Sequence, residues 1–145
     1  MHLTLHTDYA LRVLMFLATR PETKTLDTTA DIAETFDISR HHLLKICTAL
    51  SNHGYIESSR GRGGGIRLAL SPEEISVGEV VRKMEPDFEL VDCMGRDPGC
   101  LLSPVCRLRE TLHRATQAFL ERLDQYTLAS IVENDAELCA LLCDS

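Results

Sequence analysis

Residues 28–70 read TTADIAETFDISRHHLLKICTALSNHGYIESSRGRGGGIRLAL, and the spacing of their apolar residues changes once along this stretch. In the first part the apolar residues recur every three or four positions, which predicts two helices with Thr28 and Ser39 as their N-caps. In the second part apolar and polar residues alternate on both sides of a glycine-rich tip, which predicts two strands joined by a turn. Two helices on a tight connection followed by a hairpin are typical of a winged helix-turn-helix, here with the helix pair at about 28–51 and the wing at about 55–70.

Helical spacing continues on both sides of this stretch. A helix is predicted from about 8 to 19 with Thr7 as its N-cap, a short one from 76 or 77 to 84, and a long one from 105 to about 125. The 145-residue chain is therefore expected to be mainly α with one small β-hairpin. Its predicted parts are a winged helix-turn-helix DNA-binding domain at 1–86, a cysteine-bearing loop at 87–106, and a long helix with a C-terminal tail at 105–145.

The charge pattern supports a DNA-binding function. The chain has a net charge of −7, yet residues 39–70 carry five basic side chains against one acidic side chain. The second helix of the pair is expected to enter the major groove, while wing arginines neutralise phosphates or enter the minor groove. The competing interpretation is a solvated charged hairpin on another kind of α+β domain. The predicted DNA contacts are Ser39, Arg40, His41, His42, Lys45, Arg60 and Arg62.

Several classes of protein are disfavoured by the sequence. It has no apolar run of the ~18 residues needed to cross a bilayer and no secretory pattern at its start, which predicts a soluble cytoplasmic protein. An enzyme using a cysteine nucleophile or a metal-activated water is also disfavoured. The chain lacks the glycine motifs of nucleotide-binding enzymes and a recognisable constellation of catalytic residues. We therefore expect a protein that is not an enzyme.

Three of the six cysteines, Cys93, Cys100 and Cys106, lie within fourteen residues. In a reducing compartment such clustering indicates metal or redox chemistry more than disulfides. A structural zinc site prefers tighter pairs of cysteines, so the wider spacing here favours an iron–sulfur cluster. A 4Fe–4S cluster is favoured over 2Fe–2S, although three thiolates and one weaker ligand suit either.

The fourth ligand of such a cluster is not fixed by these cysteines. Cys47 is predicted on the buried side of its helix, and Cys139 and Cys143, one helical turn apart in an apolar run, are interpreted as packing residues. The remaining candidates are Asp8, Asp92, Asp97, His113 and a solvent molecule.

Four stretches of the sequence resemble a known protein family. The opening HTDYALR at 6–12, the helix start ISR at 38–40, the wing tip GRGGGI at 61–66 and the cysteine loop at 93–106 are similar to the Rrf-two family of winged-helix regulators. The similarity spans essentially the whole chain. It implies a homodimer in which the long helix from Val105 pairs across a twofold axis, with a cluster near each loop.

Within that family the cysteine loop most resembles the nitric-oxide-sensing iron–sulfur repressors. This implies a repressor whose affinity for a near-palindromic operator falls when nitric oxide damages the cluster. It also favours Asp8 of the partner subunit as a weakly held fourth ligand. The alternative is a regulator that senses iron, iron–sulfur supply or redox state. The family's regulators of iron–sulfur assembly carry a histidine where this chain has Arg109, which favours the first interpretation.

Overall fold

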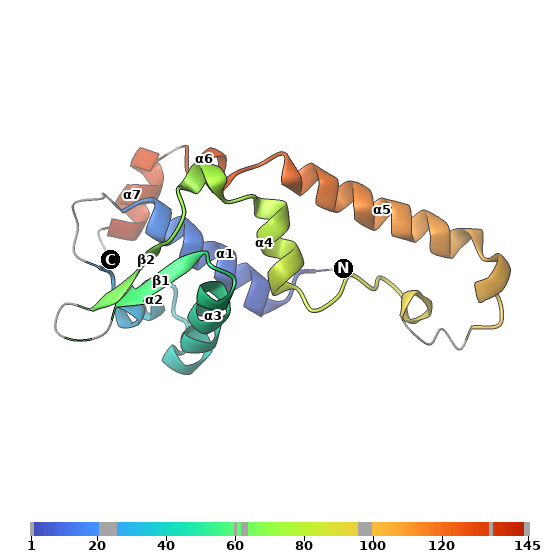
Figure 1. Cartoon of the computed structure of the whole chain (residues 1–145), viewed down its shortest axis with the longest axis horizontal. Coiled ribbons are helices and arrows are strands. Elements are labelled where there is room, and N and C mark those ends of the chain that lie inside the picture. The colour runs from blue at the N-terminus through green and yellow to red at the C-terminus, as the bar shows by residue number, and fades with distance from the viewer. Residues whose placement is uncertain are drawn as a thin grey trace.

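The helix pair and hairpin predicted from the sequence form one end of the molecule, and a long helix extends away from them (Figure 1). The computed structural model describes residues 2–20, 26–59, 61, 64–95, 100–133 and 135–143. The helices are α1 (Leu5–Ala18), α2 (Thr29–Thr35), α3 (Arg40–Asn52), α4 (Val77–Met84), α5 (Arg107–Asp124), α6 (Leu128–Ile131) and α7 (Asp135–Cys143). The strands are β1 (Ile56–Ser59) and β2 (Gly65–Leu68), and the short 3₁₀ turns are η1 (Pro72–Glu74), η2 (Asp92–Met94) and η3 (Ser103–Val105). The predicted fold class, mainly α with a small hairpin, is confirmed.

Local capping explains why α2 and α3 begin where they do. The Thr28 hydroxyl accepts from the backbone N–H of Asp31, and the Asp31 carboxylate accepts from the N–H of Thr28, so the two residues cap α2 reciprocally. Ser39 caps α3 by accepting from the backbone N–H of His42 at 3.3 Å. Asp37 takes a left-handed backbone conformation (φ +52°) in the connection between the two helices. The predicted helix-turn-helix is confirmed.

The start of α1 differs from its prediction. The helix begins at Leu5 with Thr4 as N-cap, because the Thr4 hydroxyl accepts from the backbone N–H of Thr7 at 3.3 Å. Thr7, the predicted cap, is instead fully buried inside the helix, and its hydroxyl donates to the carboxylate of Glu85. Glu85 also accepts from the backbone N–H and the hydroxyl of Thr4, each at 3.1 Å. A carboxylate just after α4 therefore holds the beginning of α1.

The wing is a short antiparallel hairpin with a third segment along its outer edge. Ile56 pairs with Leu68, and Ser59 pairs with Gly65. On the other edge of β2, the backbone N–H of Ile66 donates to the carbonyl of Asp27 at 2.8 Å. A Cβ atom on Gly65 would lie 2.5 Å from that same carbonyl oxygen, so only glycine permits this approach. The hairpin is thereby attached to the chain that leads into α2.

One hydrophobic core joins α1, α2, α3, the hairpin, α4 and α6. Its fully buried side chains include Val13, Leu14, Phe16, Ile32, Leu43, Ile46, Leu50, Ile75 and Val80. Leu128 of α6 belongs to the same core, and its backbone N–H donates to the carbonyl of Ile75 at 2.8 Å. Leu142 of α7 packs against the core as well. The residues after α5 therefore return to the DNA-binding body. Among the described residues, no helix has the length and apolarity needed to cross a membrane.

The long helix α5 contacts the body along α4. Arg82 of α4 forms a two-pronged ion pair with Asp124 at the end of α5, one prong being Nη2 to Oδ2 at 2.6 Å. This pair lowers the pKa of Asp124 below its ordinary value, because the guanidinium stabilises the charged carboxylate. Gly78 faces Asp124 at the same contact, and a Cβ atom there would lie 2.8 Å from the Asp124 backbone nitrogen. The close approach of α4 and α5 therefore depends on the glycine.

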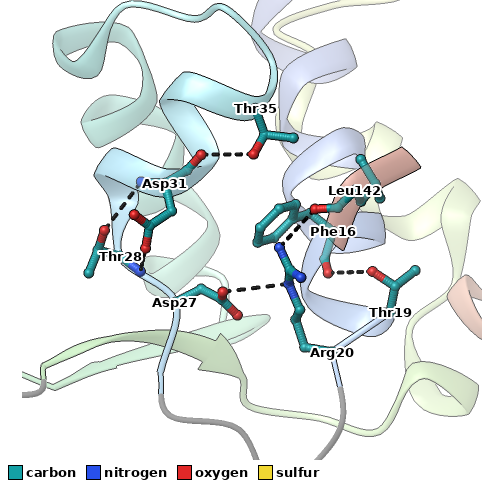
Figure 2. Close-up of polar contacts among 8 residues, drawn as sticks. All are labelled: Phe16, Thr19, Arg20, Asp27, Thr28, Asp31, Thr35 and Leu142. Carbon is teal, nitrogen blue, oxygen red and sulfur yellow. Dashed lines mark hydrogen bonds and ion pairs between the residues drawn. The ribbon is translucent and has the colours of Figure 1, made fainter. Parts of the chain in front are cut away.

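A buried arginine connects the first and last helices of the body (Figure 2). The Arg20 guanidinium lies over the Phe16 ring, 4.0 Å from its centre, and its Nε is 3.5 Å from Oδ1 of Asp27. Its Nη2 donates to the backbone carbonyl of Leu142 in α7 at 3.1 Å. Both charged side chains are about nine-tenths buried, at 11% and 8% exposure. Arg20 thus joins α1, the segment before α2, and α7.

Candidate nucleic-acid interface and metal centre

The outer face of α3 carries most of the predicted DNA contacts that the structure describes. Arg40, His41 and Lys45 are exposed, while Leu43, Ile46, Cys47 and Leu50 of the opposite face are buried in the core. Within the described residues, neither Arg40 nor Lys45 forms an ion pair, so both charges are available to a ligand. The helix has this orientation because most of its apolar residues recur at helical spacing on one side.

The other two predicted contacts on this helix have structural partners. Ser39 is exposed, but its hydroxyl caps α3. His42 is half-buried, with its ring edge-on to Tyr9 at 5.5 Å between centres and stacked near His6 at 6.4 Å. Burial lowers the pKa of His6 and the nearby His42 lowers it further, while Glu85 acts in the opposite direction. His42 therefore connects the beginning of α3 to the beginning of α1.

The wing contributes one described basic side chain. Arg67 of β2 forms an ion pair with Glu57 of β1 across the hairpin, and both are exposed. The predicted contacts Arg60 and Arg62 lie outside the described residues. The hairpin lies beside α3 in the body, as a winged helix-turn-helix requires (Figure 1).

The three clustered cysteines belong to the connection between α4 and α5 and the first residues before α5. This connection runs to the outer end of α5 (Figure 1). Cys93 in η2 is half-buried, Cys100 is exposed, and Cys106 is the half-buried N-cap residue of α5. All three are free thiols. Cys106 lines a hollow of about 550 Å³ together with Met94, Arg109 and His113. In the part of the chain that the structure describes, no three His, Cys, Asp or Glu side chains are close enough together to hold a metal ion.

The candidate fourth ligands are spread over different elements. Asp8 lies in the first turn of α1, where Arg12 donates to it at 3.0 Å. Asp92 is exposed in η2, and His113 is exposed on α5 beside the hollow that contains Cys106. Asp97 lies outside the described residues. The structure therefore brings His113 near Cys106, and it does not gather the candidate ligands into one site within this single chain.

The remaining cysteines differ from these three. Cys47 is 7% exposed in the core, as predicted, and burial raises the pKa of its thiol to about 11. Cys139 and Cys143 belong to α7, but their side chains lie outside the described part of the structure. Cys47 is therefore unsuited to metal binding, since the thiolate is the ligating form.

Two functional features escaped the sequence analysis. The helical spacing of the apolar residues in α3 predicts a core position for Leu44, but its side chain lies on the exposed face of the helix. Glu85, an ordinary acidic residue in the sequence, holds the first turn of α1 from 81 positions away. Only its place directly after a predicted helix could have drawn attention to it.

The helix pair, the hairpin and the exposed basic face of α3 define a winged-helix DNA-binding protein. The chain belongs to the Rrf2 family, described as an iron-dependent transcriptional regulator, whose sequence profile matches residues 3–134. Its membership places it among transcriptional regulators rather than enzymes.

The relatives of the chain agree with this assignment. It is 48% identical over 143 residues to the HTH-type transcriptional regulator NsrR of Bacillus subtilis, covering 98% of this chain and 97% of that protein. It is 52% identical to NsrR of Geobacillus kaustophilus, with the same coverage. Among solved structures, a transcriptional regulator from Listeria innocua is similar with a TM-score of 0.75 and 29% identity, covering 92% of this chain and 87% of that one.

Proposed function

We propose that this protein is a cytoplasmic repressor whose affinity for its operator depends on an iron–sulfur cluster and falls when nitric oxide reaches that cluster. The observation that carries the proposal is the position of three free thiols between α4 of the DNA-binding body and α5. A group bound there acts on the connection between the two parts. The similarity to NsrR proteins over 98% of the chain supports it.

The donor set fits an iron–sulfur cluster. Cys93, Cys100 and Cys106 supply three thiolates, the ligands that iron–sulfur clusters prefer. All three are outside the hydrophobic core, so they can approach one another without disturbing it. We infer a 4Fe–4S rather than a 2Fe–2S cluster. When bound, the cluster supplies iron atoms to which nitric oxide binds.

We infer that Asp8 of the partner subunit is the fourth ligand. In the single chain Asp8 is paired with Arg12, and the two side chains are 41% and 49% exposed. Exposed pairs of this kind contribute only ~0–1 kcal/mol, so the carboxylate can leave its arginine for another positive partner. A carboxylate oxygen is a hard donor and binds iron less firmly than a thiolate. The cluster would then have one ligand that is easily displaced.

The proposed homodimer is formed by α5. Leu108 on this helix is 64% exposed, and Leu112, Phe119 and Leu123 at helical spacing are only half-buried. An apolar stripe of this kind is typical of a helix that packs against another. A twofold dimer presents two α3 helices, so the operator should be a near-palindrome with half-sites ~34–36 Å apart or a multiple of that spacing.

Contacts within the chain can transmit a displacement of Asp8 to the DNA-binding helix α3. Asp8 lies one position before Tyr9, whose ring contacts His42 at the beginning of α3. Glu85 bonds both Thr4 of the same turn and the end of α4. A shift of the first turn of α1 therefore moves the beginning of α3 and the base of the cysteine segment together. The two α3 helices would then no longer match their half-sites.

The test compares three forms of the full chain on one operator. Anaerobically purified brown protein, the same protein after nitric oxide, and cluster-free protein are titrated in gel shifts. We expect at least ~10-fold weaker binding after nitric oxide, equivalent to about 1.4 kcal/mol. Equal affinities in the three forms would contradict nitric oxide sensing and leave DNA binding intact.

Ligand variants complete the test. Replacing Cys93, Cys100 or Cys106 with alanine should abolish the visible absorption, and Cys139→Ala is the matched control that should retain it. Asp8→Ala should assemble a cluster that is lost faster. An unchanged Asp8 variant would indicate His113, a loop aspartate or solvent instead.

The second candidate function is the sensing of iron, iron–sulfur supply or redox state on the same scaffold. It is favoured by the description of the family as iron-dependent. Operator binding that follows iron or oxidant and ignores nitric oxide under anaerobic conditions would support this function instead.

A further inference from the structure

The exposed face of α3 contains one large apolar side chain among basic and polar ones. Leu44 is 52% exposed, and it is the one residue of this helix that is both strongly apolar and exposed. Arg40 lies one helical turn before it and Thr48 one turn after it, and both are exposed. Lys45 is its exposed neighbour along the chain. Leu44 is therefore surrounded by side chains suited to DNA.

The surroundings of Leu44 are not those of a protein-binding patch. Single exposed leucines are common on protein surfaces and usually need no explanation. Here, however, the neighbouring exposed positions on α3 are basic or polar, so the described residues of this helix present no continuous apolar surface to a protein partner. The Thr48 hydroxyl donates to the Leu44 carbonyl at 2.8 Å, so its hydrogen is already used within the helix. The centre of this face thus offers apolar contact, and its edges offer positive charge.

We propose that Leu44 reads the 5-methyl group of a thymine in the major groove of the operator. The inference rests on the proposed DNA-binding role of α3 and adds a determinant of sequence specificity to it. Thymine alone among the four bases presents a methyl group in that groove, and apolar side chains recognise it by contact. Residues near the N-terminus of the second helix lie at the base edges in this class of protein, and Leu44 is the fifth residue of α3.

The charged neighbours of Leu44 would fix its position in the major groove. Arg40 and Lys45 form no ion pair in the described residues, so they are free to bind phosphates or guanine edges. Such contacts would hold the helix in the groove at a fixed depth. Leu44 then meets the edge of one base pair in each half-site.

The experiment removes only the methyl group. A duplex is selected from random sequences by the full, cluster-loaded protein, and each thymine of its two half-sites is replaced by uracil, one symmetric pair at a time. Burying one methyl group is worth about 0.8 kcal/mol, which corresponds to about fourfold in affinity for each half-site. We expect the affinity for each half-site to fall about fourfold when uracil replaces thymine at one position, and to change little at the other positions.

Variants assign the effect to Leu44. Leu44→Ala should bind the thymine and uracil duplexes equally at that position, whereas Leu44→Met, which retains apolar volume, should still prefer thymine. Leu141→Ala, at a residue of α7 that is 72% exposed, is the matched control and should behave as the parent. Thermal unfolding shows whether each variant is folded.

The outcomes separate the two hypotheses. The proposed recognition of thymine by Leu44 is wrong if the parent protein binds its selected duplex but distinguishes thymine from uracil at no position. It is also wrong if Leu44→Ala still distinguishes the two bases. In both cases the DNA-binding function stands. If the parent selects no duplex at all, the proposed function fails and the inference fails with it.

Discussion

Replacing Gly78 with alanine tests the close contact between α4 and α5. Two effects of the substitution oppose one another. Alanine is favoured over glycine inside a helix by ~0.5–1 kcal/mol, which would stabilise the fold. The added Cβ atom, however, would lie 2.1 Å from Oδ1 of Asp124 and 2.8 Å from its backbone nitrogen.

The backbone contact decides which effect is larger. The Asp124 carboxylate could rotate away only by giving up its two-pronged pair with Arg82. The backbone nitrogen can withdraw only if α5 shifts as a whole. Inserting a carbon into a packed contact typically costs ~1–3 kcal/mol. After the helix preference is subtracted, we expect Gly78→Ala to be destabilised by about 1–2 kcal/mol.

Thermal unfolding at fixed protein concentration measures this change. For a chain of this size the loss corresponds to a fall of roughly 3–8 °C in Tm. Glu79→Ala, at the next residue of the same helix, removes an exposed pair with Lys83 and should change Tm much less. A double variant with Asp124→Ala should remain destabilised, because the backbone clash persists. A Gly78→Ala protein that melts at or above the parent temperature would refute the reasoning.

Three further predictions concern Cys47, Glu85 and Arg20. Cys47, whose pKa burial raises to about 11, should react with iodoacetamide at pH 8 far more slowly than the exposed Cys100, as peptide mass spectrometry would reveal; equal labelling would contradict its burial. Glu85→Ala should lower the free energy of unfolding, measured in urea, by ~2–3 kcal/mol. The substitution removes the charged acceptor of three donors at the start of α1, which are the Thr4 N–H and the hydroxyls of Thr4 and Thr7. Glu89→Ala, which removes an exposed carboxylate, serves as the control. Arg20→Met should cost ~3–5 kcal/mol because it removes the ion-pair partner of a carboxylate that is only 8% exposed; adding Asp27→Asn should restore part of this loss, and no recovery would argue against the ion pair.

The sequence predicted those parts of the fold that depend on nearby residues. The caps Thr28 and Ser39 act within three positions, so α2 and α3 begin as expected. The start of α1 was placed three residues late because the choice between Thr4 and Thr7 is decided by Glu85, far along the chain. Local spacing contains no trace of such a contact.

The same distinction holds for the candidate site. Arg40 and Lys45 could be assigned to an exposed face because helical spacing fixes which side of α3 is buried. His42 could not be separated from them, since its contact with Tyr9 exists only once α1 packs on α3. Leu44 was missed for a related reason, because an apolar residue is assigned to the core unless the packing of its helix is known.

The position of Arg20 has a consequence for how the protein is made. A ribosome releases the chain from its N-terminus, so α1 to α4 emerge well before α7 is translated. Until residue 142 leaves the exit tunnel, the Arg20 guanidinium lacks its backbone acceptor in α7, although Asp27 and the Phe16 ring are already present. The DNA-binding body of a nascent chain is thus incomplete, and translation of the last helix closes it. A polypeptide interrupted before α7 lacks the contact between Arg20 and Leu142 that joins the segment after α1 to the C-terminal helix.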